Sequence, residues 1–362
     1  MQYYTNIYNK IHQRFFSAEE KFMYEAILLA EKGISGASPN PMVGAVVVKN
    51  GVIAGRGYHE KYGMAHAEIN AINDAGIENC RNAVLYVTLE PCSTYGKTPP
   101  CTEAIIKAGF SEVVIASTDP NPKHAGRGMK ILKDAGIKVT AGVLHEITDE
   151  LNEAFFFRIT HNRPFILLKM GITLDGKTAA PNGHSKWITS PEARQRVQYL
   201  RRWADAVMVG GNTVRKDRPS LNVRKTDGTV DSSEKQPVRI IVSSEMTEEE
   251  AEVYLSAGEA PLIIHPASEQ EWITKLSEFA DMGINAVLVE GGSKLAGELI
   301  KYRLINKFEF HIAPKILGGK NSYPIAELPD PGSMSDALEL TSVNFYSIGD
   351  NLIYSGYPVY KI

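Results

Sequence analysis

The sequence predicts an α/β protein of two domains, and three observations support this fold class. The chain has 362 residues, about twice the size of a common single domain. Predicted strands alternate with predicted helices along most of its length, a pattern typical of layered α/β domains. The segment "HNRPF" (161–165) interrupts the alternation. Because proline disfavours helix at the residue before it, this segment is predicted to be a linker.

The first predicted domain covers residues 17–160, after an N-terminal extension, 1–16, without a clear pattern. A helix is expected from Ser17, which can cap it with Glu20 three residues on, to Gly33, which can end it. A β-hairpin follows, because two β-rich runs flank Asn50-Gly51, a pair that favours a type I′ turn. Helices are then expected over residues 65–75, 102–108, 127–135 and 146–160. Strands are expected between them, over residues 83–88, 112–117 and 137–144.

The second predicted domain covers residues 166–362 and repeats the α/β pattern without repeating the sequence of the first. A polar stretch with Gly, Asp and Ser, residues 225–236, is expected to be an exposed loop. Helices are expected over residues 191–203, 269–279 and 293–300. Strands are expected over residues 165–176, 206–210, 238–244, 261–265, 284–290, 307–317 and 351–359.

Composition indicates an ordinary globular protein of a reducing compartment. Hydrophobic residues make up 43% and charged residues 22%, and a net charge of -3 gives no overall field that would attract nucleic acid. Three cysteines, Cys80, Cys92 and Cys101, are a poor disulfide framework. The N-terminus is too polar for a signal-peptide core, and no apolar run reaches the length of a membrane span. We therefore expect a cytoplasmic protein.

Two short motifs contain the residue types of a catalytic zinc site. "HAE" places His66 and Glu68 two residues apart at a predicted helix start, and "EPCSTYGKTPPC" contains Cys92 and Cys101. Catalytic zinc takes three protein ligands and leaves one position for water, which the histidine and two cysteines can provide. Glu68 could then move the proton of that water. Taken singly, an H-x-E motif more often belongs to a charged surface, and an intracellular cysteine is more often a small buried residue. We expect this structural role for Cys80.

The pattern resembles the cytidine-deaminase-like zinc deaminases, whose signature is H-x-E followed by P-C-x-x-C, with the glutamate as proton shuttle. Here eight residues separate the two cysteines, a departure that resembles one branch, the bifunctional riboflavin biosynthesis deaminase/reductases. The motifs that carry this resemblance, in chain order, are "SPNPMVGAVVV", "GYHEKYGMAHAE", "TLEPCSTYGKTPPC", "DPNPKHAGRG", "LKMGITLDGKTA", "SKWITS" and "VEGGSKLAG". The resemblance implies a cytidine-deaminase-like three-layer domain followed by a dihydrofolate-reductase-like α/β domain.

The resemblance also implies two successive reactions. The first domain, with one zinc ion, would remove an amino group by hydrolysis from a diaminopyrimidinone that carries a phosphoribosylamino group. The second would use NADPH to reduce the ribosyl group to a ribityl chain. Implied substrate contacts in the first domain are Asn40, His59, Lys97, Asp119 and Asn121. A lysine suits a phosphate, although "DPNP" is also a strong turn sequence and a loop lysine is often only solvated.

In the second domain the resemblance implies substrate contacts at Lys169, Ser185, Arg201, Leu221, Arg224 and Glu290. It implies cofactor contacts at Gly171, Trp187, Thr213, Asp217, Ser243, Gly292, Ser293, Lys294, Leu295, Ala296, Gly297 and Glu298. "VEGGSKLAG" ends a predicted strand and opens a helix, where backbone N–H groups can bind cofactor phosphates. It is not G-x-G-x-x-G, so a Rossmann fold is not indicated. In isolation, a Gly-Gly pair more often forms only a tight turn, and a tryptophan more often belongs to the core. An arginine-rich helix more often presents a solvated basic face. The proton donor, with Lys169 and Asp175 nearby in the family, is left open.

Two alternatives remain at this stage. A nucleic-acid-editing deaminase would share "HAE" and "PC", but it would need a basic groove and no second domain. Alternatively, the second half could be a binding or assembly module without catalysis. The expected partners are small phosphorylated pyrimidines, with neither nucleic acid nor membrane. Exposed strands expected in the second domain favour a homo-oligomer, a dimer or tetramer.

Overall fold

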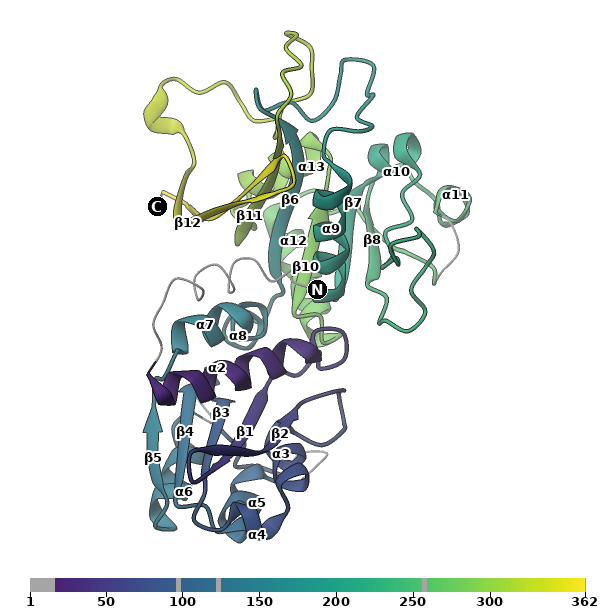
Figure 1. Cartoon of the computed structure of the whole chain (residues 1–362). Coiled ribbons are helices and arrows are strands. Elements are labelled where there is room, and N and C mark those ends of the chain that lie inside the picture. The colour runs from purple at the N-terminus through teal and green to yellow at the C-terminus, as the bar shows by residue number, and fades with distance from the viewer. Residues whose placement is uncertain (1–16, 96–98, 122–124, 256–258, 362) are drawn as a thin grey trace. The chain divides into compact units, whose positions relative to one another are not determined.

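The computed structural model describes residues 17–95, 99–121, 125–255 and 259–361. These residues form two compact units, which divide between Arg163 and Pro164 (Figure 1). Helix α8 ends at His161 and strand β6 begins at Phe165, so only residues 162–164 of the predicted linker lie outside regular elements. The exact domain limits stay a prediction, and the N-terminal extension lies outside the described residues.

The first unit is built on a five-stranded mixed sheet in the order β2-β1-β3-β4-β5. Strands β1 and β2 form the predicted antiparallel hairpin, and Asn50 and Gly51 both have positive φ (52° and 76°), as a type I′ turn requires. Strands β3, β4 and β5 run parallel to one another, while β1 pairs antiparallel with β3. The strands are β1 (Gly44–Lys49), β2 (Val52–Tyr58), β3 (Val84–Leu89), β4 (Glu112–Ser117) and β5 (Lys138–Ala141).

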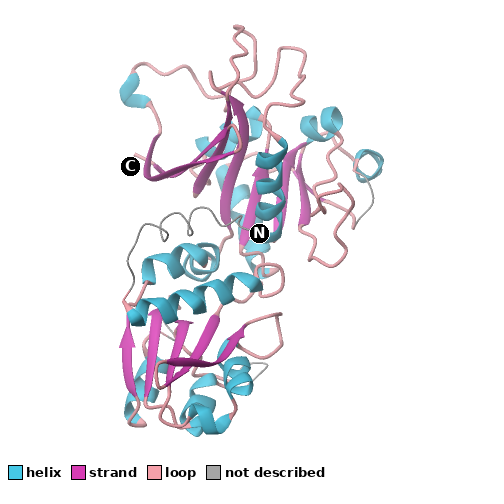
Figure 2. Ribbon diagram, in the orientation of Figure 1, coloured by secondary structure: helices cyan, strands magenta, loops and turns pink. Residues whose placement is uncertain are grey.

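Helices cover both faces of this sheet, which gives the expected three layers (Figure 2). Helices α2 (Ala18–Ala30) and α7 (His145–Leu151) lie on one face, with α8 (Glu153–His161) beside them. The predicted capping box of α2 is present, because Ser17 and Glu20 each bond the other's backbone N–H. The opposite face is covered by α3 (Ala67–Ala75), α5 (Cys101–Ala108) and α6 (Arg127–Asp134), with the short α4 (Ile77–Cys80).

The single helix expected over residues 146–160 is instead two helices that meet at Asn152. Its side chain leaves the helical pattern to bond the backbone of Met42 in both directions. Asn152 Oδ1 accepts from the Met42 N–H (2.8 Å), and Nδ2 donates to the Met42 carbonyl (2.9 Å). An asparagine that bonds a distant backbone competes with helix continuation. The Asn152 side chain therefore anchors the segment that contains Met42 and Asn40.

The second unit is built on an eight-stranded sheet in the order β12-β13-β11-β6-β10-β7-β8-β9. The six strands from β11 to β9 are parallel, and β13 and β12 add an antiparallel hairpin at one edge. Strand β12 was not predicted, because most of its residues are exposed and lack the apolar alternation of a half-buried strand. The strands are β6 (Phe165–Thr173), β7 (Ala206–Gly210), β8 (Val238–Val242), β9 (Leu262–Ile264), β10 (Ala286–Glu290), β11 (Lys307–Ala313), β12 (Glu339–Ile348) and β13 (Asn351–Val359).

One face of this sheet carries the apolar core and the other carries helix α9 (Pro191–Trp203). Ile166, Leu168 and Met170 point from β6 into the core, where helices α12 (Glu269–Asp281) and α13 (Ser293–Lys301) pack. The alternate residues of β6 therefore face α9. Helices α10 (Gly211–Asp217) and α11 (Glu248–Tyr254), each of seven residues, were not predicted, because so short and polar a helix shows no clear apolar stripe.

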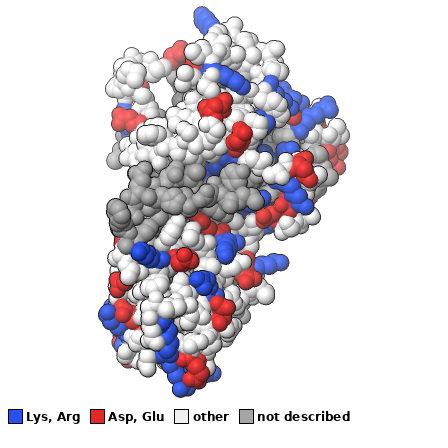
Figure 3. All heavy atoms as spheres, viewed as in Figure 1, with Lys and Arg blue, Asp and Glu red and all other residues white. Residues whose placement is uncertain are grey.

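Charged side chains of both signs are interspersed on the face of the molecule shown in Figure 3, without an extended basic area among the described residues. This distribution agrees with the low net charge of -3. Among the helices described, none is long and apolar enough to span a membrane.

Candidate active sites

The first unit brings together the three predicted zinc ligands. His66 precedes α3 as its N-cap residue, Cys92 lies in the loop after β3, and Cys101 is the first residue of α5. His66 Nδ1 lies 3.5 Å from Cys92 Sγ and 3.3 Å from Cys101 Sγ, and all three candidate ligand atoms lie within 4.8 Å of one another. One imidazole nitrogen and two sulfurs at this spacing are a donor set that fits catalytic zinc.

The electrostatics of this cluster act in opposite directions on the two thiols, because the hydrogen bond between them and burial raise the pKa of Cys101 while that of Cys92 is lowered. The pKa of the Cys92 thiol is lowered to about 4, chiefly because Cys101 donates a hydrogen bond to it, with a further contribution from His66. The Cys101 N–H also donates to Cys92 Sγ at 3.2 Å. The thiolate is the form of cysteine that binds metal. Cys92 is therefore prepared as a ligand by its neighbours.

Glu68 lies in the first turn of α3 beside these ligands, with only 3% of its surface exposed. Burial raises its pKa to about 7, and the charge of Cys92 adds to this effect. A carboxyl group that titrates near neutrality can both accept and donate a proton at physiological pH. The position is the one the sequence predicted for a proton shuttle.

Asn40 and His59 also lie at the metal cluster. The His59 ring makes an edge contact with the His66 ring, with centroids 5.3 Å apart. Its Nδ1 donates to the Ala65 carbonyl (3.1 Å), which leaves Nε2 to accept from Asn40 Nδ2 (3.1 Å). Burial lowers the pKa of His59, and this bonding pattern requires the neutral ring. Their role as substrate contacts stays a prediction.

The remaining predicted contacts of the first unit are less clearly placed. Asp119 Oδ1 accepts a hydrogen bond from the Asn121 N–H (2.8 Å), so the side chain of Asp119 stabilises the turn expected for "DPNP". The role of both residues as substrate contacts stays a prediction. Lys97 lies outside the described residues. Cys80 is fully buried in the apolar core, apart from the cluster.

The second unit contains a cavity of about 880 Å³ toward the carboxyl ends of strands β6, β7, β8 and β10. All six predicted substrate residues line it, namely Lys169, Ser185, Arg201, Leu221, Arg224 and Glu290. Most predicted cofactor residues line it too, namely Gly171, Trp187, Thr213, Asp217, Ser243, Gly292, Ser293, Lys294, Leu295 and Glu298. Ala296 and Gly297 do not. Helical periodicity turns them away, so Ala296 is buried in the core and Gly297 packs on the backbone of Glu327.

A row of charged residues crosses strands β10, β6 and β11 and reaches the cavity wall at Lys169, Arg201 and Glu290. Lys169 of β6 is in register with Glu290 of β10 on one side and with Glu309 of β11 on the other. Arg201 of α9 binds Glu290 through two hydrogen bonds of 2.6 and 3.0 Å. Arg196, also from α9, binds Glu309 in the same way at 3.1 and 2.9 Å. The solvated basic face considered for this helix is therefore wrong for both arginines, which are buried.

Histidine His311 completes this row at its β11 end. It is fully buried, and its Nε2 donates to Glu309 Oε1 at 2.8 Å. Its Nδ1 finds no hydrogen-bond partner among the described residues. Desolvation by burial lowers its pKa to about 4, with Lys169 as the next cause. The ring is therefore neutral at physiological pH.

The Gly-Gly turn joins β10 to α13 at the cavity wall. Gly291 and Gly292 have φ of 77° and 89°, values that residues other than glycine rarely adopt. A Cβ atom at Gly292 would lie 3.2 Å from Thr213 Oγ1. The turn therefore has little room for a side chain. It leads into a helix of nine residues, and the free N–H groups at the N-terminus of such a helix can bind an anion.

Trp187 is 64% exposed at the cavity rim, so it is not a core residue. The Arg194 guanidinium lies over its ring, 4.3 Å from the centroid. Lys315 Nζ donates to the carbonyls of Trp187 (2.7 Å) and Ile188 (2.8 Å). An exposed aromatic ring held at both its side chain and its backbone is a suitable platform for a flat ligand group.

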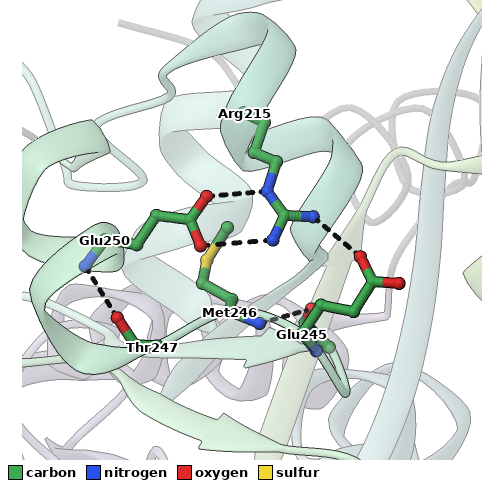
Figure 4. A network of polar contacts seen from close by, with 6 residues as sticks. Arg215, Glu245, Met246, Thr247 and Glu250 are labelled. Atoms are coloured by element: carbon green, nitrogen blue, oxygen red, sulfur yellow. Dashed lines mark hydrogen bonds and ion pairs between the residues drawn. The ribbon is translucent and has the colours of Figure 1, made fainter.

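Polar contacts that the sequence did not reveal hold another part of the rim (Figure 4). Arg215 of α10 binds Glu250 of α11 through hydrogen bonds of 2.8 and 3.2 Å and reaches Glu245 at 3.5 Å. The Met246 N–H donates to Ser243 Oγ at 3.2 Å. These contacts join α10, α11 and the segment after β8, so the ion pairs fix the surroundings of Ser243. Nothing in the local spacing of these residues signals the pairing.

Comparison with known proteins agrees with these two sites. A family model described as "Cytidine and deoxycytidylate deaminase zinc-binding region" matches residues 16–117. A second, "RibD C-terminal domain", matches residues 164–354. The fold and sites thus define a two-domain enzyme, a zinc-dependent deaminase joined to a reductase. The chain belongs to the RibD family of bifunctional riboflavin biosynthesis enzymes.

Curated relatives and solved structures cover nearly the whole chain. The riboflavin biosynthesis proteins RibD of Aquifex aeolicus and Escherichia coli are 42% and 35% identical, covering 92% of this chain in each case and 97% and 98% of theirs. The structure of Acinetobacter baumannii RibD, form 1, has a TM-score of 0.84 at 32% identity and covers 95% of this chain and 99% of its own. Another, from Thermotoga maritima, is described as a diaminohydroxyphosphoribosylaminopyrimidine deaminase/5-amino-6-(5-phosphoribosylamino)uracil reductase, with a TM-score of 0.80 at 35% identity over 94% of this chain and 99% of its own.

Family membership decides between the alternatives raised by the sequence. The enzyme acts on small molecules, which disfavours a nucleic-acid-editing deaminase. The reductase domain is a family domain, so the second unit is not merely an assembly module. The two domains imply a zinc ion in the first unit and a nicotinamide cofactor in the second.

Proposed function

We propose that the first domain, residues 17–160, deaminates a diaminopyrimidinone that carries a phosphoribosylamino group. The observation that carries this proposal is the cluster of His66, Cys92 and Cys101 with buried Glu68 beside it. When bound, zinc supplies an activated water at neutral pH. Glu68 would take a proton from the attacking water and pass it to the departing amino group. Water and substrate are thereby converted to a carbonyl and ammonia.

Further residues of this domain hold the substrate. The neutral His59 ring, fixed by Ala65, orients the Asn40 side chain toward the pyrimidine. Asn152 anchors Met42, two residues from Asn40. Asp119 and Asn121 hold the ribose, and Lys97 binds the phosphate as a point charge. Together these contacts select a phosphorylated small molecule.

We propose that the second domain, residues 166–362, reduces the ribosyl group of the deaminated product with NADPH. The cofactor supplies the hydride. The N–H groups that follow Gly292 bind its phosphates, and Thr213, Asp217 and Ser243 line the remainder of its site. Lys169, Arg201 and Arg224 also line the cavity and outnumber the carboxylate of Glu290 that pairs with Arg201, which suits the substrate phosphate. Glu290 orients Arg201 there.

Assays of the two half-reactions test this proposal. We expect ammonia release from the phosphoribosylamino substrate, and oxidation of NADPH rather than NADH with the deaminated product. Glu68→Gln removes the proton shuttle, so we expect ammonia release to fall by about a hundredfold or more, with zinc retained and NADPH oxidation unchanged. Full deaminase activity in this variant would refute the mechanism.

We also propose that the enzyme works in the cytoplasm as a homo-oligomer, a dimer or tetramer. Strand β12 supports this, because it lies at the edge of the sheet and exposes Phe345 (67%) and Val343 (41%). Light scattering of the purified chain measures its mass directly. A monomer at micromolar concentration would contradict the oligomer.

A further inference from the structure

Glu90 is a buried carboxylate to which the mechanism above gives no role. It follows β3 directly and precedes Pro91 and the zinc ligand Cys92. Its side chain is almost wholly enclosed, with 6% of the residue exposed. Its backbone N–H donates to the Ser117 carbonyl at 2.9 Å, which extends the pairing of β3 with β4. The side chain therefore starts from a fixed point of the sheet.

Both oxygens of the Glu90 carboxylate accept hydrogen bonds from the backbone of one later segment. Oε2 accepts from the N–H groups of Gly126 (2.9 Å) and Asp119 (3.3 Å). Oε1 accepts from those of Gly128 (2.8 Å) and Met129 (3.2 Å). All four donors are backbone groups. The carboxylate therefore fixes the course of the chain around it.

The start of helix α6 lies directly on the loop that carries Cys92. Its N-cap residue, Gly126, provides no capping side chain, so Glu90 supplies the negative charge and the acceptors that a helix N-terminus favours. A Cβ atom at Gly128 would lie 2.3 Å from the Pro91 carbonyl oxygen. That carbonyl belongs to the peptide bond that joins Pro91 to Cys92. Backbone contact and hydrogen bonds thus tie the same two segments together.

We infer that Glu90 is a positioning residue of the deaminase, which sets the place of the Asp119–Asn121 turn relative to the zinc ligand Cys92. The inference rests on the proposed function, in which this turn holds the phosphoribosyl part of the substrate while the pyrimidine lies at zinc. One side chain thereby controls the separation between the two ends of the substrate site. Its loss affects binding of the phosphoribosyl part more than it affects the metal.

Glu90→Gln in the full chain tests this inference. The amide nitrogen would bring N–H donors against backbone N–H donors, so one half of the interaction is lost while the size of the side chain is kept. We expect the KM for the phosphorylated substrate to rise about tenfold, with a much smaller change for the dephosphorylated substrate. Zinc content and the reductase half-reaction, which belongs to the other domain, are expected to stay at wild-type values.

Glu112→Gln is the matched control. Glu112 lies at the opposite end of β4 and accepts from Thr140 Oγ1 (2.8 Å) and Lys138 Nζ (3.0 Å), away from the metal cluster. We expect it to leave both KM values unchanged. An unchanged KM in Glu90→Gln, an equal rise for both substrates, or loss of zinc would overturn the positioning role alone. Failure of the wild-type chain to release ammonia would overturn the proposed function and the inference with it.

Discussion

The neutral His311 ring, fully buried on strand β11, makes the second unit sensitive to acid. In the unfolded chain this histidine takes up a proton near its ordinary pKa of 6.5, whereas in the folded unit it does so only near pH 4. A folded pKa below the unfolded one means that the unfolded state binds more protons between these values. Stability is therefore fully present above pH 6.5 and is lost as the pH falls toward 4.

The size of this effect follows from the two pKa values. Between pH 7 and pH 5 the free energy of unfolding is expected to fall by about 2 kcal/mol through His311 alone. Burial opposes ionisation of the Glu309 carboxyl, but Arg196 and His311 outweigh burial and hold its pKa below the ordinary value of 4.5. Its contribution to stability is therefore present above about that value and is lost mainly as the pH falls below it. The unit's other two histidines, His184 and His265, are exposed. Burial raises the pKa of Asp217 in the same unit, so a variant at position 311 is needed to separate the His311 contribution from that of other groups.

Urea unfolding of wild type and His311→Gln at pH 7 and pH 5 measures the effect. All three tryptophans, Trp187, Trp203 and Trp272, lie in the second unit, so tryptophan fluorescence follows this unit specifically. Glutamine cannot titrate and keeps an N–H donor for Glu309, so the variant is expected to lose about 2 kcal/mol less than wild type over this range. Equal losses in the two proteins would refute the reasoning.

Two further predictions concern the metal and the cofactor. The Cys92→Ser/Cys101→Ser variant is expected to bind less than about a tenth of the wild-type zinc, because a serine hydroxyl is a poor zinc ligand, and zinc retained in metal analysis would contradict the ligand set. Gly292→Ala is expected to weaken NADPH binding about tenfold, measured by fluorescence titration, because the residue has positive φ and meets Thr213. Gly283→Ala, also at positive φ but outside the cavity lining, is its control, and equal affinity in both variants would contradict a role for the turn.

The sequence predicted features that depend on local spacing. The capping box at Ser17 and the turn at Asn50-Gly51 were predicted correctly, because the chain neighbours that determine them lie within a few residues. The zinc cluster is a different case, since His66 lies 26 and 35 residues from Cys92 and Cys101. It was predicted from the ligand types that zinc prefers and from the resemblance of the two motifs to a known signature.

Features that depend on distant backbone groups could not be predicted. Asn152 ends a helix because it bonds Met42, 110 residues away in the sequence. Glu90 binds N–H groups up to 39 residues later, and no periodicity reveals a carboxylate whose partners are all peptide groups. The charged row around Lys169 depends on the register of three parallel strands, which only the assembled sheet determines.

The place of β6 in its sheet has a consequence for synthesis of the protein. This strand is made first in its unit, yet both of its neighbours, β10 and β11, come from residues 286–313. A ribosome therefore produces more than a hundred residues while the apolar strand "FILLKMGIT" has two open edges, which are templates for pairing with other chains. Prematurely terminated chains that lack β10 and β11 would thus be candidates for aggregation and for capture by chaperones, whereas the zinc ligands of the first unit are all present once residue 101 has been made.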